Sequence, residues 1–238
     1  MIRALTVLLL PVVLIAAELL VYAPEATSSL VVQRAFMADP AMAGQTILVM
    51  PRWRSFEEAL AEHPRAWALV AAPILSESGW IPVLQGQRLG SPTFRYRIIA
   101  IDHAVGLEPR GTLGLVQECG RERIDDFVAA GFPGCTLPGR HRSVAKASDL
   151  LQLLGLEMVS GVMVTPTLAT TAMASFPGRV RVLAESRRMR LPVLVVREPA
   201  DCAPAMSLVA LGSAALTSIN LDALVPFTGD PQPWVSGE

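Results

Sequence analysis

Lysine, aromatic residues and cysteine are all scarce in this sequence of 238 residues. Lys146 is the only lysine, and the formal net charge of −1 does not suggest a nucleic-acid partner or a basic membrane-surface patch. Aromatic residues make up 5% of the chain, which disfavours a β-sandwich and an aromatic-lined sugar site. We therefore expect no nucleic-acid partner.

The sequence also lacks the short motifs of the commonest catalytic and metal sites. It contains no G-x-S-x-G elbow, Walker loop, HExxH or GxGxxG motif. Asp125 and Asp126 are adjacent, so on a helix they point about 100° apart and do not form a facing carboxylate pair. His63, His103 and His141 have no CxxC or HxxxH companion. We expect a protein that is not an enzyme and that holds no metal or cofactor.

Residues 1–17 have the layout of a secretory signal peptide. Arg3 precedes an uncharged apolar run, and Ala17 offers a small residue for cleavage. The run is short for a bilayer span, which needs about 20 residues, although residues 19–23 extend it and leave an uncleaved anchor open. We expect a periplasmic or otherwise extracytoplasmic protein, cleaved near Ala17.

Short apolar segments alternate with helical segments in the first part of the chain. We expect strands at 18–23, 46–50 and 67–71, and a capping box of Ser55 and Glu58 at the start of the second intervening helix. Wholly apolar strands that alternate with helices indicate a parallel sheet covered on both faces.

The same plan returns between residues 104 and 190, where a second α/β unit is expected. A final apolar helix, at about 203–220, belongs with the first unit by chain order. The elements expected in the second unit are strands at 111–116, 135–137, 159–164 and 180–184, and helices at 121–130 and 144–154.

Two similar apolar segments, 94–103 and 191–197, separate these units. Both are rich in β-forming residues, and we expect them to be crossing hinge strands. The chain then divides into a first lobe of 18–93 with 198–238 and a second lobe of 104–190.

The order of these pieces resembles that of periplasmic solute-binding proteins of the phosphonate/sulfonate/transferrin-like (type II) class. Residues 80–90 (WIPVLQGQRLG) resemble the segment that leads into the first hinge strand, and residues 94–101 resemble that strand. Residues 150–164 resemble a helix-Gly-strand unit of the second lobe, and 191–197 the returning strand. The resemblance implies a two-lobed α/β fold with parallel-rich sheets flanked by helices, a monomer that captures a small molecule between its lobes, and handover to an ABC-type permease in the inner membrane.

Parallel sheets bind ligands at the carboxyl ends of their strands, which defines a candidate binding wall. Thr27 and Ser28 can equally be ordinary helix N-caps. Glu118 opposes an anionic ligand, because two like charges about 4 Å apart cost on the order of 4 kcal/mol at an effective dielectric near 20, and Arg121 would have to offset this. We therefore favour a neutral or weakly charged ligand over a free phosphonate. The candidate wall consists of Pro24, Thr27, Ser28, Pro73, Glu118, Gly120, Arg121 and Thr165.

The three cysteines are Cys119, Cys135 and Cys202. In an oxidising compartment two of them can pair, and 119–135 is the candidate disulfide, although the sequence does not determine connectivity.

Three functional classes are compatible with this sequence. The first is the extracytoplasmic solute-binding component of an importer, which we favour. The second is a ligand-sensing or accessory binding module that acts on a membrane partner. The third is an enzyme built on the same two-lobed frame, because catalytic groups dispersed in sequence leave no motif.

Overall fold

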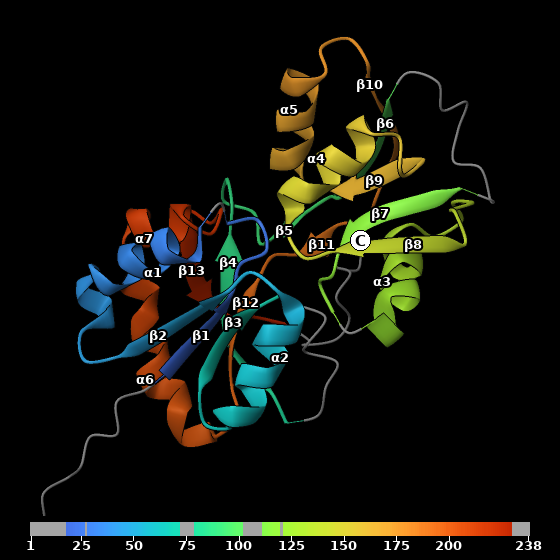
Figure 1. Cartoon of the computed structure of the whole chain (residues 1–238). Helices are drawn as coiled ribbons and strands as arrows, with labels where there is room; N and C mark the ends of the chain where they lie inside the picture. The colour runs from blue at the N-terminus through green and yellow to red at the C-terminus, as the bar shows by residue number, and fades with distance from the viewer. Residues whose placement is uncertain (1–17, 27, 72–78, 102–110, 120, 230–238) are drawn as a thin grey trace, which may run out of the picture.

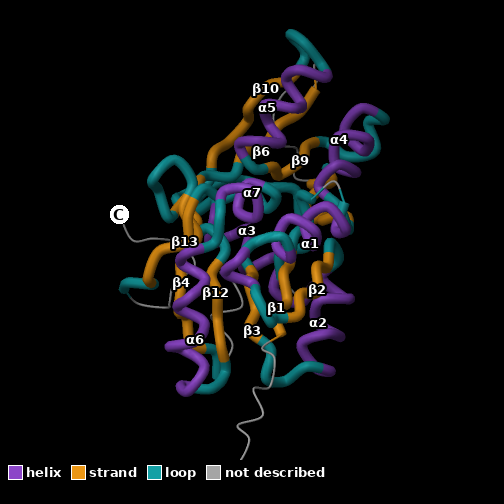
Figure 2. The backbone as a smooth tube through the Cα atoms, turned by 90° about the vertical axis from the view of Figure 1, so that its left-hand side faces the viewer, coloured by secondary structure: helices purple, strands orange, loops and turns teal. Residues whose placement is uncertain are grey.

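The computed structural model describes residues 18–26, 28–71, 79–101, 111–119 and 121–229. These residues form two α/β lobes, each built around its own sheet (Figure 1). The first lobe has a six-stranded sheet in the order β13-β4-β12-β3-β1-β2, and the second a five-stranded sheet in the order β10-β6-β9-β7-β8. Figure 2 shows β10, β6 and β9 standing above the first sheet.

Three parallel strands form one half of the first sheet, as the sequence predicts. β1 lies between β2 and β3 and runs parallel to both. Its side chains alternate between two cores: Leu19 and Val21 pack with α1, whereas Leu20 and Tyr22 pack with α2. Helices therefore cover both faces of this half. The elements are β1 (Glu18–Tyr22), α1 (Ser29–Met37), β2 (Thr46–Met50), α2 (Trp53–Glu62) and β3 (Trp67–Val70).

The predicted capping box at the start of α2 is wrong. The helix begins at Trp53, and Arg52 is its N-cap residue without a side-chain cap. Ser55 therefore lies inside the helix, and Glu58 accepts a hydrogen bond from Arg54 Nε at 3.0 Å instead. The helix begins at Trp53 because its buried apolar face consists of Trp53, Phe56 and Leu60.

The other half of the first sheet is antiparallel and comes from distant parts of the chain. β12 lies between β3 and β4, and β13 pairs with the outer edge of β4. The strands are β4 (Ile81–Gln87), β12 (Val193–Val196) and β13 (Ala223–Pro226).

The long C-terminal helix predicted at 203–220 is wrong, because the segment is broken into α6 (Cys202–Met206), a 3-10 turn and α7 (Ser213–Thr217). Leu211 and Gly212 are extended between them, and Gly212 N donates to Asp39 Oδ2 at 2.6 Å. A Cβ atom at Gly212 would lie 2.8 Å from that oxygen, so this contact requires glycine or a shift of Asp39.

The second sheet also has three parallel strands, with β7 between β8 and β9. The strand predicted at 135–137 is instead β8, which starts at Arg140. β8 lies at the edge of the sheet and has the sequence RHRSV, so no apolar run marks it as a strand. The elements are β6 (Arg97–Ile101), β7 (Thr112–Val116), α3 (Ile124–Gly131), β8 (Arg140–Val144), α4 (Ala147–Gly155), β9 (Gly161–Val164), α5 (Pro166–Ser175) and β10 (Val180–Glu185).

A two-stranded ribbon lies between the sheets, formed by β5 (Thr93–Phe94) and β11 (Met189–Arg190). It is shorter than the hinge strands predicted at 94–103 and 191–197, because most of each segment belongs to a sheet. β6 pairs with β9 and β10 in the second sheet, whereas β12 pairs with β3 and β4 in the first. The predicted lobe boundaries stay a prediction.

Within the described residues, no helix is both long enough and apolar enough to cross a membrane. The predicted signal peptide, residues 1–17, lies outside the described residues.

Candidate functional site

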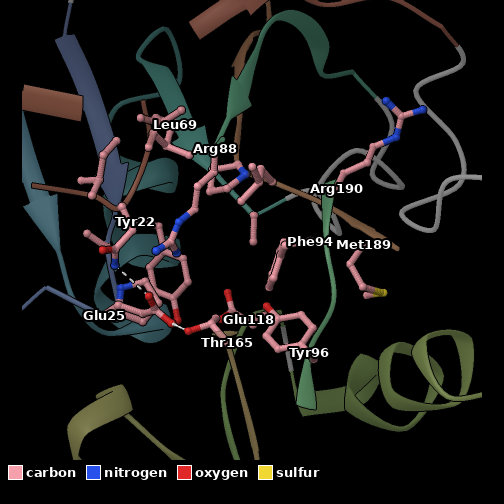
Figure 3. Close-up of a pocket in the computed structure, with 18 of the residues that line it drawn as sticks. Tyr22, Glu25, Leu69, Arg88, Phe94, Tyr96, Glu118, Thr165, Met189 and Arg190 are labelled. Carbon is pink, nitrogen blue, oxygen red and sulfur yellow. Dashed lines mark hydrogen bonds between the residues drawn. The ribbon is translucent and has the colours of Figure 1, made fainter. Parts of the chain in front are cut away.

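A cavity lies where the two lobes meet, beside the β5–β11 ribbon (Figure 3). It encloses about 90 Å³, and at roughly 10–15 Å³ per water this volume holds a few waters or one compact ligand group. The polar side chains in its wall are Tyr22, Glu25, Arg88, Tyr96, Glu118, Thr165, Arg190 and Asn220.

Glu25 enters the cavity from the turn that follows β1. One carboxylate oxygen accepts a hydrogen bond from the Thr165 hydroxyl, and the other accepts one from Asn220 Nδ2 at 2.8 Å. Thr165 belongs to the second lobe, where it caps α5 ahead of Pro166. Glu25 therefore joins the two lobes directly.

Arg88 reaches the cavity from a tight turn at the end of β4. Leu89 and Gly90 both have positive φ, 51° and 71°, and Arg88 N donates to Ser91 O at 2.9 Å. Figure 3 shows the Arg88 side chain directed toward Glu25, whereas Arg190 extends away from the cavity. The guanidinium of Arg190 lies 5.2 Å from the ring centre of Phe227.

Further hydrogen bonds connect the lobes around this cavity. They join first-lobe residues to the turn after β7 and to the starts of α4 and α5, so the lobes are closed on each other. The donor and acceptor pairs are the Tyr22 hydroxyl to Gln117 O, Ala147 N to Pro24 O at 3.2 Å, and Arg88 Nη1 to Thr167 Oγ1.

Glu118 faces the same cavity from the second lobe, two residues after β7 ends. Its side chain is buried, at 8% exposed, and it shares a hydrogen bond with the Tyr96 side chain. Burial and then the nearby charge of Glu25 raise the pKa of Glu118 to about 8, against the lowering effect of the Tyr96 hydrogen bond. Glu118 is therefore mostly protonated at neutral pH in this arrangement.

The pKa of Glu25 is also raised, chiefly by burial. Three partners oppose the rise by stabilising the ionised form: Thr165, the positive charge of Arg88, and Asn220. The two carboxyls thus share one cavity but have different surroundings.

Aromatic side chains line the wall beside Glu118. The rings of Phe94 and Tyr96 are 4.6 Å apart between centres at an interplanar angle of 62°, and those of Tyr96 and Phe127 are 5.9 Å apart at 80°. Met189 lines the cavity next to them, and the apolar wall continues through Leu191. The site therefore combines an apolar interior with a few fixed polar groups, as small-molecule sites do.

The predicted wall residues are only partly brought together. Pro24, Glu118 and Thr165 line the cavity. Ser28 is the N-cap residue of α1 and makes no side-chain cap hydrogen bond, while Arg121 is exposed in a 3-10 turn, and neither lines the cavity. Thr27, Pro73 and Gly120 lie outside the described residues. A ligand-binding role for these residues stays a prediction.

Sequence reasoning missed Glu25, Arg88, Tyr96 and Asn220. Glu25 follows the end of β1, so the same rule that selected Pro24 would have included it. Arg88 and Tyr96 come from segments around the ribbon, and Asn220 from a turn near the C-terminus where it adopts a φ of 61°. No motif marks these three positions.

The two cysteines of the candidate 119–135 disulfide lie in different surroundings, and their pairing stays a prediction. Cys119 is buried in the core beneath the second sheet, whereas Cys135 is exposed after α3. The side chain of Cys202 is half-buried in the first lobe.

Two of the histidines pair with single carboxylates. His63 Nδ1 lies 2.6 Å from Glu18 Oε2, and His141 Nδ1 lies 2.8 Å from Asp125 Oδ1. His103 lies outside the described residues. Across the described part of the chain, no three His, Cys, Asp or Glu side chains gather as a metal site would require.

No family model and no curated protein matches the sequence. Solved structures do match. A protein of Xanthomonas citri bound to ATP is 15% identical with a TM-score of 0.65, over 90% of this chain and 91% of that one. A binding-protein component of an ABC phosphonate transporter from Pseudomonas aeruginosa is 10% identical with a TM-score of 0.63, over 89% of this chain and 81% of that one.

An ancestral arginine-binding protein bound to glutamine is 12% identical with a TM-score of 0.52, over 82% of this chain and 90% of that one. At such identities the likeness concerns the fold. The predicted resemblance is confirmed at that level: the chain has the two-lobed α/β fold of the type II periplasmic-binding-protein class.

Proposed function

We propose that the protein is an extracytoplasmic solute-binding protein that captures a small ligand between its lobes and delivers it to an ABC-type importer. The cavity with walls from both lobes carries this proposal. The binding-protein component from Pseudomonas aeruginosa, which shares the fold, supports it. The proposed role is binding and handover, without chemical change of the ligand.

The proposed binding cycle uses the ribbon β5–β11 as the hinge. A ligand in the cavity touches both lobes, so it binds the closed arrangement more tightly than an open one and shifts the population toward closure. The contacts of Glu25 with Thr165 and of Pro24 with Ala147 then form or break together as the lobes move.

The proposal includes export by residues 1–17 and a permease in the inner membrane as the partner. N-terminal sequencing of the periplasmic fraction is expected to begin near Glu18. Full-length protein in the cytosol would remove the importer assignment. Co-purification with a signalling protein in place of a permease would favour the sensing module.

The central experiment is native mass spectrometry of protein purified from its own periplasm, followed by small-angle scattering with and without the ligand that co-purifies. We expect a monomer with one small ligand, and a smaller radius of gyration when the ligand is present. Scattering that does not respond to any bound ligand would contradict the proposed function.

A further inference from the structure

The helix starts beside the cavity already have acceptors from the protein itself. Backbone N–H groups at helix N-termini are the usual donors to a bound anion. Here the first amide of α4, Ala147 N, donates to Pro24 O at 3.2 Å, and Leu168 N in α5 donates to Thr165 Oγ1 at 3.4 Å. The Thr165 hydroxyl in turn donates to Glu25. Both amides are thus satisfied by acceptors of the chain itself, and the carboxylate of Glu25 lies at the start of α5 through its hydrogen bond from Thr165.

The positive charge that faces this region also has a protein partner. Arg88 attracts the charge of Glu25 and donates from Nη1 to Thr167. Asn220 completes the surroundings of Glu25. An incoming anion would therefore have to displace Glu25 from these partners.

Glu118 has the opposite situation, with a buried carboxyl and spare acceptor capacity. Tyr96 is the one hydrogen-bond partner that the described residues give it. A carboxylate has about four lone-pair sites, so it can accept further donors. Its side chain is 8% exposed and lines the cavity. A donor that carries positive charge would occupy the remaining acceptor sites and would stabilise the ionised form of this buried carboxyl.

The aromatic wall suits the same kind of ligand. Phe94, Tyr96 and Phe127 form a connected set of rings next to Glu118, with Met189 beside them. Ring faces attract cations within about 6 Å of the centroid, and aromatic surroundings are a common way to bind ammonium groups. Carboxylate and aromatic wall thus favour a cation with an apolar body, and disfavour a phosphonate.

We propose that the solute captured in this cleft is a small organic cation, an ammonium group on a compact apolar body, which places its charge at Glu118 and its apolar part against Phe94, Phe127 and Met189. This inference rests on the proposed function, since it names the class of solute for the same cleft. The raised pKa of Glu118, caused first by burial and then by Glu25, agrees with it: an arriving cation stabilises the carboxylate, and the proton of Glu118 passes to solvent.

The test is calorimetry of the mature protein with matched pairs of probes: choline with its neutral carbon isostere dimethylbutanol, and butylamine with butanol, with methylphosphonate as the anion. We expect a cation to bind roughly tenfold or more tightly than its neutral partner. Titration in buffers of different ionisation enthalpy should show proton release on binding.

Glu118→Gln separates charge from shape, because glutamine can still accept the hydrogen bond from Tyr96. We expect it to weaken the cation roughly tenfold, to leave the neutral isostere unchanged and to abolish proton release. The matched control is Glu57→Gln, which removes the same charge from an exposed position on α2 and should change none of these values. A thermal melt of each variant checks that it is folded.

Equal affinity for cation and isostere, binding of methylphosphonate, or no binding of either cation would overturn this inference. The proposed function fails by a different result, the absence of any ligand-dependent compaction. A non-cationic solute that closes the lobes therefore overturns the ligand class alone.

Discussion

Glu25 and Glu118 face one cavity from opposite lobes, and their surroundings differ. Glu25 has three stabilising partners, Thr165, Asn220 and Arg88, whereas Glu118 has only the hydrogen bond of Tyr96 among the described residues. The pKa of both is raised by burial, and that of Glu118 reaches about 8. Glu25 therefore connects the two lobes through its hydrogen bonds, whereas Glu118 can accept further hydrogen bonds from a ligand.

The pH dependence of stability offers the largest test of this difference. In the unfolded chain Glu118 ionises near its ordinary pKa of 4.5, whereas in the folded protein it keeps its proton to about pH 8. The contribution of protonated Glu118 to the free energy of unfolding is fully present below pH 4.5, and it is lost as the pH rises to about 8. Glu118→Gln removes this loss, and we expect it to exceed the wild type in stability at pH 9 by on the order of a few kcal/mol.

Urea unfolding at pH 5 and pH 9 measures the effect, with both proteins free of ligand. The exposed control Glu57→Gln should follow the wild type. A residual slope is expected in Glu118→Gln because the pKa of Glu25 is also raised by burial. Parallel pH profiles for wild type and Glu118→Gln would show that Glu118 is not held protonated in the fold.

Removal of the Glu25 carboxylate should favour the open arrangement of the lobes. Glu25→Ala leaves the Thr165 hydroxyl, the Asn220 amide and the Arg88 guanidinium without their shared acceptor. We expect the closed arrangement to lose about 2–3 kcal/mol relative to the open one, seen as a larger radius of gyration in small-angle scattering.

Tyr22→Phe is the matched control for this opening. It removes one uncharged hydrogen bond between the lobes, to Gln117 O, and keeps the ring contact with Trp53 at 5.5 Å. Its effect should be smaller, at about 1 kcal/mol. Equal scattering from wild type and Glu25→Ala would mean that Glu25 does not hold the lobes together.

A substitution at Tyr96 should raise the pKa of Glu118 further. Burial raises the pKa of Glu118 most, and the hydrogen bond from Tyr96 lowers it. Tyr96→Phe removes that bond, so the pKa of Glu118 should rise above its wild-type value at a cost of about 1 kcal/mol in stability. Carbon NMR of labelled glutamate side chains follows the titration. An unchanged or lower pKa would contradict the assigned hydrogen bond.

The sequence predicted the apolar parallel strands of both sheets well, and missed the polar parallel strand β8 at the edge of the second sheet. β1, β3, β7 and β9 are apolar runs because helices and neighbouring strands bury them on all sides, and the edge strand β2 is apolar because its side chains pack into the same cores. β8 is a polar strand at the edge of the second sheet, and the broken C-terminal segment depends on the contact of Gly212 with Asp39. Neither leaves a local pattern.

Some residues of the candidate site could likewise be predicted from the sequence, and others could not. The rule that ligands lie at the carboxyl ends of parallel strands found Pro24 and Glu118, and it applies to Glu25 as well. Arg88, Tyr96 and Asn220 reach the cavity only through the pairing of β4 with β12 and β13 and through the course of the ribbon. Such long-range pairing is set by the whole fold, so single-sequence patterns do not reveal it.

The position of β12 in the first sheet determines the order in which the two lobes can complete their folding. Every strand of the second sheet comes from the continuous stretch 97–185, so that sheet can assemble as soon as this stretch has emerged. The first sheet begins with the earliest strand, β1, yet β3 and β4 lack their common neighbour until residues 193–196 arrive. The lobe that starts first during synthesis or translocation is thus completed last. A chain halted before β12 would have one finished lobe and no cavity.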